Sequence, residues 1–368
     1  MSTPPARRGP GSALRVEQLE DRTVPSFSPF QATGGESIAI GNVVPEASGP
    51  AVNEYVVGAG PGQSPFVRIY DTSGNLEFQF MAYESTYTGG VNVAVGNVVV
   101  DPATGSVSPE IITGTGPGGG PLVKVFSPST GKVISQFFAY ETTFRGGVNV
   151  AAGQLNAGST AEEIVTGSGF GGGPVVRVFT GAGKALSSFY AYESTFRNGV
   201  NVAAGDAIPT GPTGANAGDE IVTGPGEGGS PLLRVFSSRG ALLQSYFAFD
   251  SNDRNGLVVT IGTTAGPTTS TLSGQQIFAA EQFTPLSAAP RVRGFNGADE
   301  QVVTDFSPYP AGYTRYLNLA VGEVASDPSV AANLNSGDLV VVAGEGPVGQ
   351  VPLIQYGKVG SAAGNNGP

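Results

Sequence analysis

The stretch that decides the fold runs through Gly147-Val-Asn-Val-Ala-Ala-Gly153, Glu163-Ile-Val-Thr-Gly167, Pro174-Val-Val-Arg-Val-Phe179 and Ser188-Phe-Tyr-Ala-Tyr-Glu193. Each of these four segments is short, rich in β-branched or aromatic residues and bounded by Gly, Pro, Ser or Asn, which is typical of a β-strand. Four such strands followed by a restart of the pattern indicate a four-stranded antiparallel sheet. The stretch therefore predicts a unit of roughly 55 residues that is repeated along the chain.

Two independent landmarks count the copies of this unit. The glycine that ends the first strand recurs at Gly41, Gly96, Gly153, Gly205, Gly262 and Gly322, and the proline that opens the third strand recurs at Pro65, Pro121, Pro174, Pro231, Pro290 and Pro352. No segment has the 3.6-residue apolar spacing of a helix. Because stacked copies share one continuous core, we expect a single all-β domain, a six-bladed β-propeller of four-stranded antiparallel blades.

The sixth copy lacks a fourth strand at the C-terminal end of the chain. A segment that resembles this strand, Ser26-Phe-Ser-Pro-Phe-Gln31, lies near the N-terminus instead. We therefore expect a ring closed by an N-terminal strand, which would pair with Pro352-Leu-Ile-Gln-Tyr356 and hide two sheet edges. This prediction places the propeller at residues 26–357, between an N-terminal tail (1–25) and a C-terminal tail (358–368) that we expect to be disordered.

Two further patterns follow the repeat. The third strands carry a cation at Arg68, Lys124, Arg177, Arg234 and Arg293, and the fourth strands end on an anion at Glu84, Glu141, Glu193, Asp250 and Asp305. The near-constant separation predicts a structural ion pair within each blade, such as Arg177 with Glu193, and a ring-shaped ligand surface is the alternative.

The first strands share a polar position at Ser37, Asn92, Asn149, Asn201 and Asn318. These amides either line a channel or bond between blades, and we favour the second because a buried amide must be paired.

Composition excludes several classes of function. The net charge is −11 and no Lys/Arg cluster follows the N-terminal tail, which argues against nucleic-acid binding. The chain has no Cys and no His, so it has no disulfides and lacks the commonest general base. No apolar run reaches the length of a membrane span. The motif Gly114-Thr-Gly116-Pro-Gly-Gly119 matches a dinucleotide fingerprint, but a strand follows where the fingerprint needs a helix, so we interpret it as a turn.

The segments Asn149-Val-Ala-Ala-Gly153, Glu163-Ile-Val-Thr-Gly167, Gly171-Gly-Gly-Pro174 and Arg177-Val-Phe179 resemble FG-GAP/VCBS-type repeats. Such repeats form the propeller of integrin α-subunit heads and of many bacterial extracellular proteins. The resemblance covers most of Phe27–Tyr356 and implies an integrin-α-like propeller of bacterial exported type. Arg15-Val-Glu-Gln-Leu-Glu-Asp-Arg-Thr-Val-Pro-Ser26 is similar to a motif at the start of many large exported bacterial proteins. It implies a sorting motif and an extracellular or cell-envelope location, and a disordered tail with one amphipathic turn is the alternative.

Members of that family often carry a calcium loop, Asp-x-Asp-x-Asp-Gly, between the first and second strands. A hard cation of this kind needs several oxygen ligands at alternating positions. The corresponding loops of this chain lack the alternating carboxylates, and the best remnant is Asp206 with Asp219 and Glu220. We therefore expect no cofactor and no metal, with calcium at these three residues as the weaker alternative.

Two classes of function stay open. The uniform repeat without His or Cys favours a non-catalytic binding, adhesion or surface-structural module that is a monomer, has no catalytic residues and takes an unknown protein or polysaccharide ligand. The alternative is a propeller hydrolase or lyase that acts on polysaccharide, because carboxylate pairs perform glycoside chemistry without His. An active site would break the repeat at one place. The irregular stretch is Gly262–Gly312, which carries Glu281, Arg291, Arg293, Asp299, Glu300 and Asp305.

Overall fold

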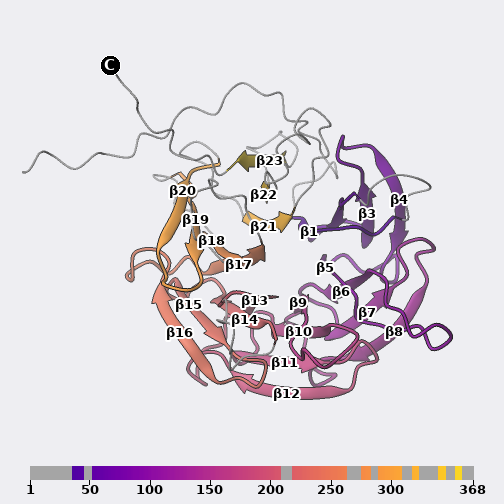
Figure 1. The fold of residues 1–368 in the computed structure, drawn as a ribbon, viewed down its shortest axis with the longest axis horizontal. Helices are drawn as coiled ribbons and strands as arrows, with labels where there is room; N and C mark the ends of the chain where they lie inside the picture. Colours follow the sequence, from indigo (N-terminus) through magenta and orange to yellow (C-terminus); the bar gives the residue numbers. More distant parts are fainter. Residues whose placement is uncertain are drawn as a thin grey trace, which may run out of the picture.

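The computed structural model describes residues 35–44, 52–208, 218–262, 275–282, 289–308, 317–322, 339–344 and 353–358, the last two ranges as backbone only. The described residues form antiparallel sheets that stand around a common axis like the blades of a propeller (Figure 1). Each sheet runs in chain order from an inner strand at the axis to an outer strand at the rim. The predicted all-β propeller with four-stranded antiparallel blades is therefore confirmed.

Five blades have four strands each. Blade 1 contains β1 (Ser37–Gly41), β2 (Glu54–Gly58), β3 (Phe66–Tyr70) and β4 (Leu76–Met81). Blade 2 contains β5 (Val91–Gly96), β6 (Glu110–Thr115), β7 (Leu122–Phe126) and β8 (Val133–Phe138). Blade 3 contains β9 (Val148–Gly153), β10 (Glu163–Ser168), β11 (Val175–Phe179) and β12 (Ala185–Tyr190). Blade 4 contains β13 (Val200–Gly205), β14 (Glu220–Pro225), β15 (Leu232–Phe236) and β16 (Leu242–Phe247). Blade 5 contains β17 (Leu257–Gly262), β18 (Gln276–Glu281), β19 (Val292–Asn296) and β20 (Val302–Phe306).

The prediction of six four-stranded blades is wrong, because five blades with four strands are described. The remaining sheet has three strands in the described part of the chain, β21 (Leu317–Gly322), β22 (Leu339–Gly344) and β23 (Leu353–Lys358). The last copy of the repeat reaches only its third strand before the C-terminal segment begins. The segment Ser26–Gln31, which we expected to supply its fourth strand, lies outside the described residues, so closure by that strand stays a prediction.

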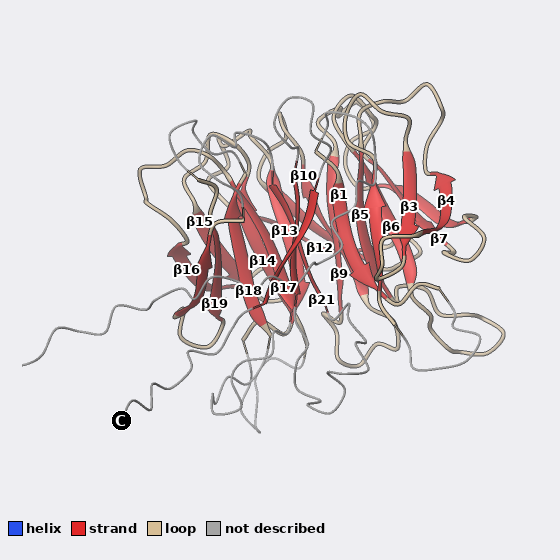
Figure 2. Ribbon diagram, turned by 90° about the horizontal axis from the view of Figure 1, so that it is seen from above, coloured by secondary structure: helices blue, strands red, loops and turns tan. Residues whose placement is uncertain are grey.

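The core lies between neighbouring blades. The inner strand β21 lies beside both β17 and β1, so the inner strands surround the axis (Figure 1). Seen from the side, the strands run between loops that lie at the two ends of the blades (Figure 2). The second strands β6, β10 and β14 are buried along their whole length, whereas the outer strands β8 and β12 contain only half-buried and exposed residues. Val123 and Val125 of blade 2, for example, pack in one cluster with Ile164 and Phe179 of blade 3. Each blade therefore buries apolar side chains against its neighbours, which explains why the strands are rich in Val, Ile and Phe.

The hairpin between the third and fourth strands shows why glycine recurs at one turn position. Gly183 has a φ of +84°, and a Cβ added there would lie 2.6 Å from the ring of Phe137 in the preceding blade. Both the left-handed backbone and the close contact favour glycine. In blade 5 this turn position is held by Glu300, with a φ of +61°.

Candidate functional site

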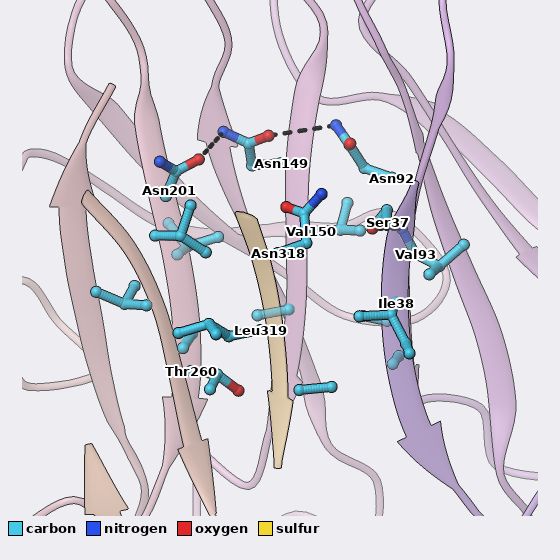
Figure 3. Close-up of a pocket in the computed structure, with 18 of the residues that line it drawn as sticks. Ser37, Ile38, Asn92, Val93, Asn149, Val150, Asn201, Thr260, Asn318 and Leu319 are labelled. Carbon is cyan, nitrogen blue, oxygen red and sulfur yellow. Dashed lines mark hydrogen bonds between the residues drawn. The ribbon is translucent and has the colours of Figure 1, made fainter. Parts of the chain in front are cut away.

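A polar ladder crosses the inner strands around the axis (Figure 3). Asn92 Nδ2 donates to the backbone oxygen of Val148 at 2.8 Å and to Asn149 Oδ1 at 3.2 Å. Asn149 repeats the pattern with Val200 O at 2.7 Å and Asn201 Oδ1 at 3.1 Å. Asn318 Nδ2 donates to Glu36 O at 2.5 Å, which joins the sixth sheet to the first blade. The prediction that these amides bond between blades is confirmed.

The same amides also line the central cavity, so the two readings of their position are compatible. The cavity has a volume of about 200 Å³ and is lined by inner strands of all six sheets. Among the described residues that line it, Thr260 is the one polar side chain besides Ser37 and the asparagines, and the others are Val, Ile, Leu and Ala. The amide N–H groups donate to the neighbouring blades, so the main role of the ladder is to connect the blades. Few amide donors are left for a ligand in the cavity.

A second set of contacts, which we call the inter-blade clamp, joins the residues after a fourth strand to the next blade. The hydroxyl of Tyr140 lies 3.2 Å from Thr166 Oγ1 and donates to Val175 O at 3.0 Å. Arg177 of the same next blade lies over the ring of Tyr140 at 5.1 Å and donates to Ala139 O at 2.8 Å. Burial raises the pKa of Tyr140, so its hydroxyl stays neutral and available as a donor.

The clamp recurs at the neighbouring interfaces. Tyr83 meets Thr113 and Lys124 between blades 1 and 2, and Tyr192 meets Thr223 and Arg234 between blades 3 and 4. Between blades 4 and 5 the cation is Arg293, which lies 5.1 Å from the ring of Phe249 and donates to Ala248 O. There Phe249 replaces the tyrosine and Ala279 replaces the threonine, so both hydroxyls are lost together. A buried hydroxyl without its partner would be costly, which explains the joint replacement.

The clamp corrects the predicted ion pairs. Arg177 faces Ser188 across its own blade, and its guanidinium contacts Glu141 of the preceding blade at 3.1 Å rather than Glu193. Arg177 and Glu193 are 16 residues apart, and this separation is nearly constant from blade to blade. It is constant because every blade repeats both positions, although the cation and the anion belong to two neighbouring interfaces. Only in blade 5, among the described residues, does the predicted pair form within a blade, with Arg293 Nε 3.0 Å from Asp305 Oδ2.

Carboxylates organise the loops between the first and second strands. Glu110 Oε2 accepts the backbone N–H groups of Val98 at 2.9 Å and Val99 at 3.2 Å, and Glu54 does the same for Val43 and Val44. Burial raises the pKa of Glu110 to about 6, although these two hydrogen bonds act in the opposite direction. These carboxylates thus bind backbone donors at the position where the resembling family places a metal loop.

The three metal candidates lie in this same set of loops. Asp219 Oδ2 accepts the N–H of Gln154 in the preceding blade at 2.7 Å, and Glu220 Oε2 accepts the N–H of Ile208 at 3.0 Å. Burial is the main cause that raises the pKa of both groups, and the charge of Asp206 adds to it. Among the described residues no three acidic side chains converge as metal ligands would. The observed role of Asp219 and Glu220 is therefore to hold loop backbone.

The irregular fifth blade brings together a group that sequence reasoning found only in part. Glu281 ends β18, is 8% exposed, and accepts a hydrogen bond from Asn255 Nδ2 at 2.9 Å. Burial is the first cause that raises its pKa, and the nearby carboxyl of Asp253 raises it further, whereas Arg291 lowers it. Asp253 stands where the regular blades carry Phe144 and Phe196. This break in the repeat was the signal that could have revealed it.

The other residues of the irregular stretch make contacts of their own, although the charge of Arg291 also acts on Glu281. Arg291 and Arg293 both bind Asp305, and Arg293 also forms the clamp described above. Asp299 Oδ1 accepts the N–H of Gln301 within its turn. Glu300 holds the left-handed turn position.

A shallow hollow of about 450 Å³ lies between the loops of blades 1 and 2. It is lined by Pro61, the segment 86–89, Pro117 and Gly118. Thr88 stands there in the position that the next interfaces give to Arg145 and Arg197. Exposed Thr86 and Thr88 bring hydroxyl groups to the hollow, and Tyr87 brings an aromatic ring.

Comparison with known proteins identifies no family for this chain. No family model and no curated protein sequence matches the chain. A structure of BBS1N in complex with ARL6DN matches with a TM-score of 0.46, 11% identity, and coverage of 86% of this chain and 81% of that one. Rhamnogalacturonan lyase YesW matches with a TM-score of 0.41 and 12% identity over 87% of this chain and 59% of the lyase. A protein of unknown function from Bacteroides caccae has the same TM-score and identity, over 83% of this chain and 94% of that one. Likenesses at this level of similarity carry no argument about this chain. In the described part of the chain, no helix has the length and apolar character needed to cross a membrane.

Proposed function

We propose that this chain is a non-catalytic binding or surface-structural propeller of FG-GAP/VCBS type from an exported bacterial protein. The observation that supports it is how the repeated polar side chains are used. The asparagines, the clamp cations and the loop glutamates bond in register between or within blades, as Asn149, Arg177 and Glu110 do. A scaffold whose repeated polar groups bond to each other is rigid, and it is better suited to presenting a binding surface than to forming a single active site.

The hollow between blades 1 and 2 is the favoured place for a ligand. Hydroxyl groups and an aromatic ring beside prolines suit the hydroxylated, partly apolar face of a polysaccharide, or an extended protein segment. The test is a calorimetric screen of the full chain against polysaccharides and basic proteins, with and without calcium. Thr88→Arg should weaken a ligand found there at least about tenfold, because it gives this interface the arginine of its neighbours. Thr104→Arg, an exposed change away from the hollow, is the matched control, and equal binding by both variants would exclude the hollow.

A polysaccharide hydrolase or lyase is the second candidate, and Glu281 beside Asp253 is the observation that favours it. A carboxyl with a raised pKa next to a second carboxyl is the kind of pair that general acid–base chemistry uses. Release of new reducing or unsaturated ends from a panel of polysaccharides would reveal this activity, and Glu281→Gln should abolish it. Cleavage that survives Glu281→Gln would assign the activity to another group, and no cleavage of any polysaccharide would remove the candidate.

Ring closure and export complete the proposal. The matched polar residues Gln31 and Gln355 support pairing of the N-terminal segment with the last sheet, since the charges of the other copies are absent at both positions. The resemblance of residues 15–26 to a sorting motif supports export. A fusion of residues 1–25 to a reporter, fractionated between cytoplasm and envelope of the source bacterium, tests that part, and a wholly cytoplasmic reporter would contradict it.

A further inference from the structure

The outer wall of the ring carries a repeated row of exposed apolar residues. Most large apolar side chains that are exposed in the described residues lie on the fourth strands, among them Phe138 at 53%, Tyr190 at 60% and Phe247 at 49%. These strands are the last in their sheets, so each has one edge without a neighbouring strand in the described structure (Figure 1). Exposed apolar edge strands are templates for pairing with another strand.

Three of these edge strands lack the charged residues and prolines that often protect an edge from pairing. The strands β8, β12 and β16 contain no charged residue and no proline, whereas β4 contains Glu77 and β20 contains Asp305. Natural proteins usually place a charge or a proline on an edge to prevent association. In a chain with a net charge of −11, the absence of charge from three edges means that two molecules could meet there without burying like charges.

The outward faces of these strands are self-complementary. In β8 the exposed residues Ile134 and Phe138 lie two positions before and after exposed Gln136. The same order of aliphatic, polar and aromatic residues recurs as Leu186, Ser188 and Tyr190, and as Leu243, Ser245 and Phe247. If two copies of β8 pair antiparallel about Gln136, each Ile134 faces the Phe138 of the second copy, which is a favourable cross-strand pair. A β-bulge at the start of β8 leaves Ile134 as an extra residue opposite Phe126.

The charges that flank the strands fit the same arrangement. Exposed Lys132 precedes β8 and exposed Glu141 follows it, so antiparallel pairing brings each lysine next to the glutamate of the second copy. Lys184 and Glu193 flank β12 in the same way, and Arg239 and Asp250 flank β16. Parallel pairing would instead bring like charges together. Charge therefore favours the antiparallel, two-fold arrangement, in which one patch serves both molecules.

We infer that a second copy of this chain binds at these edges, so that the propeller associates laterally through antiparallel pairing of β8, β12 and β16. With three competent edges on one ring, the association extends beyond a dimer as concentration rises. This proposal differs from the monomer expected from sequence. It goes beyond the proposed function and does not depend on it, because a monomeric propeller could still bind its ligand.

The natural absence of cysteine makes a direct test possible. A residue on the two-fold axis faces its own copy at about 4.5–5.5 Å between Cα atoms, which is within disulfide range. Gln136→Cys and Ser188→Cys should therefore form cross-linked dimers under mild oxidation. Gln79→Cys occupies the equivalent exposed position on β4, the strand that carries Glu77, and is the matched control that should cross-link at least about tenfold more slowly.

Sedimentation of the full chain over a wide range of concentration provides the second test. The average mass should rise with concentration, and the triple variant Phe138→Lys, Tyr190→Lys and Phe247→Lys should raise the dissociation constant at least about tenfold. Phe170→Lys, at an even more exposed phenylalanine on a loop, should leave the association unchanged. All four substitutions are exposed, and an unchanged melting temperature shows that each variant folds. A wild type that stays monomeric, or cysteines that cross-link no faster than the control, would overturn the inference and leave these edges to a partner of different sequence. Ligand binding measured on the same samples reports separately on the proposed function.

Discussion

The inter-blade clamp permits a prediction whose size follows from the structure. In Tyr140→Phe the ring stays between the blades and only the hydroxyl is lost. That hydroxyl contacts Thr166 Oγ1 and Val175 O, at 3.2 and 3.0 Å. When the phenol hydroxyl is lost, the Thr166 hydroxyl still has an acceptor within reach, because its Oγ1 lies 3.3 Å from Arg177 O. Each lost hydrogen bond is worth about 1 kcal/mol, so we expect Tyr140→Phe to lower the free energy of unfolding by about 1–2 kcal/mol.

The natural pair Phe249 and Ala279 shows how the loss can be relieved. Removing both hydroxyls leaves neither hydroxyl without the other, so Tyr140→Phe combined with Thr166→Ala should cost less than the sum of the two single changes, by about 1 kcal/mol. Urea denaturation gives these values if all four proteins show the same dependence on denaturant. The reverse cycle serves as the control, because Ala279→Thr should relieve part of the cost of Phe249→Tyr. Simple additivity in the first cycle would refute the coupling that the 3.2 Å contact implies.

Four further outcomes are expected. Arg177→Ala should lower the free energy of unfolding by about 2 kcal/mol, because Arg177 is 30% exposed, binds Ala139 O and covers Tyr140. Glu141→Gln, at a side chain that is 74% exposed, should lower it by less than about 1 kcal/mol. Equal losses would mean that the ion pair dominates. The raised pKa of Glu110 means that its buried carboxyl is stable when protonated, so this contribution is complete below about pH 4.5 and is lost as the pH rises through 6. Glu110→Gln should therefore remove about 1–2 kcal/mol of pH dependence from this window, as measured by unfolding at several pH values, and an unchanged profile would contradict the assignment. Excess chelator should leave the melting temperature unchanged, because Asp219 holds the N–H of Gln154, and a large fall would assign a metal to Asp206, Asp219 and Glu220. Deletion of residues 1–32 should lower the melting temperature by exposing an edge of the last sheet and deletion of residues 1–14 should not, and equal effects would argue against ring closure by Ser26–Gln31.

Much of the fold could be predicted from the sequence because strand signals are local. Alternation of apolar residues, together with Gly and Pro at fixed spacing, marks each strand of the regular blades. The glycine landmarks Gly96, Gly153 and Gly205 each end a first strand as expected. The three strands described for the last sheet were also predicted from the sequence. The landmarks in the sequence count copies of the repeat, whether or not a copy forms a complete blade. The prediction therefore overstated the number of four-stranded blades.

What only the tertiary structure decided is which neighbour each side chain meets. In a repeat, the residue of the same blade and the residue of the preceding blade recur with the same period, so spacing cannot tell Glu193 from Glu141 as the partner of Arg177. Stacking of the blades decided it, because the third strand points its cation across the interface at Ala139 O and the ring of Tyr140. Asp253 and Glu281 likewise became a pair only when two blades met. The sequence by itself determined the strands and their order, since these depend on local preferences, and packing determined the contacts between blades, since these depend on side chains that are distant along the chain.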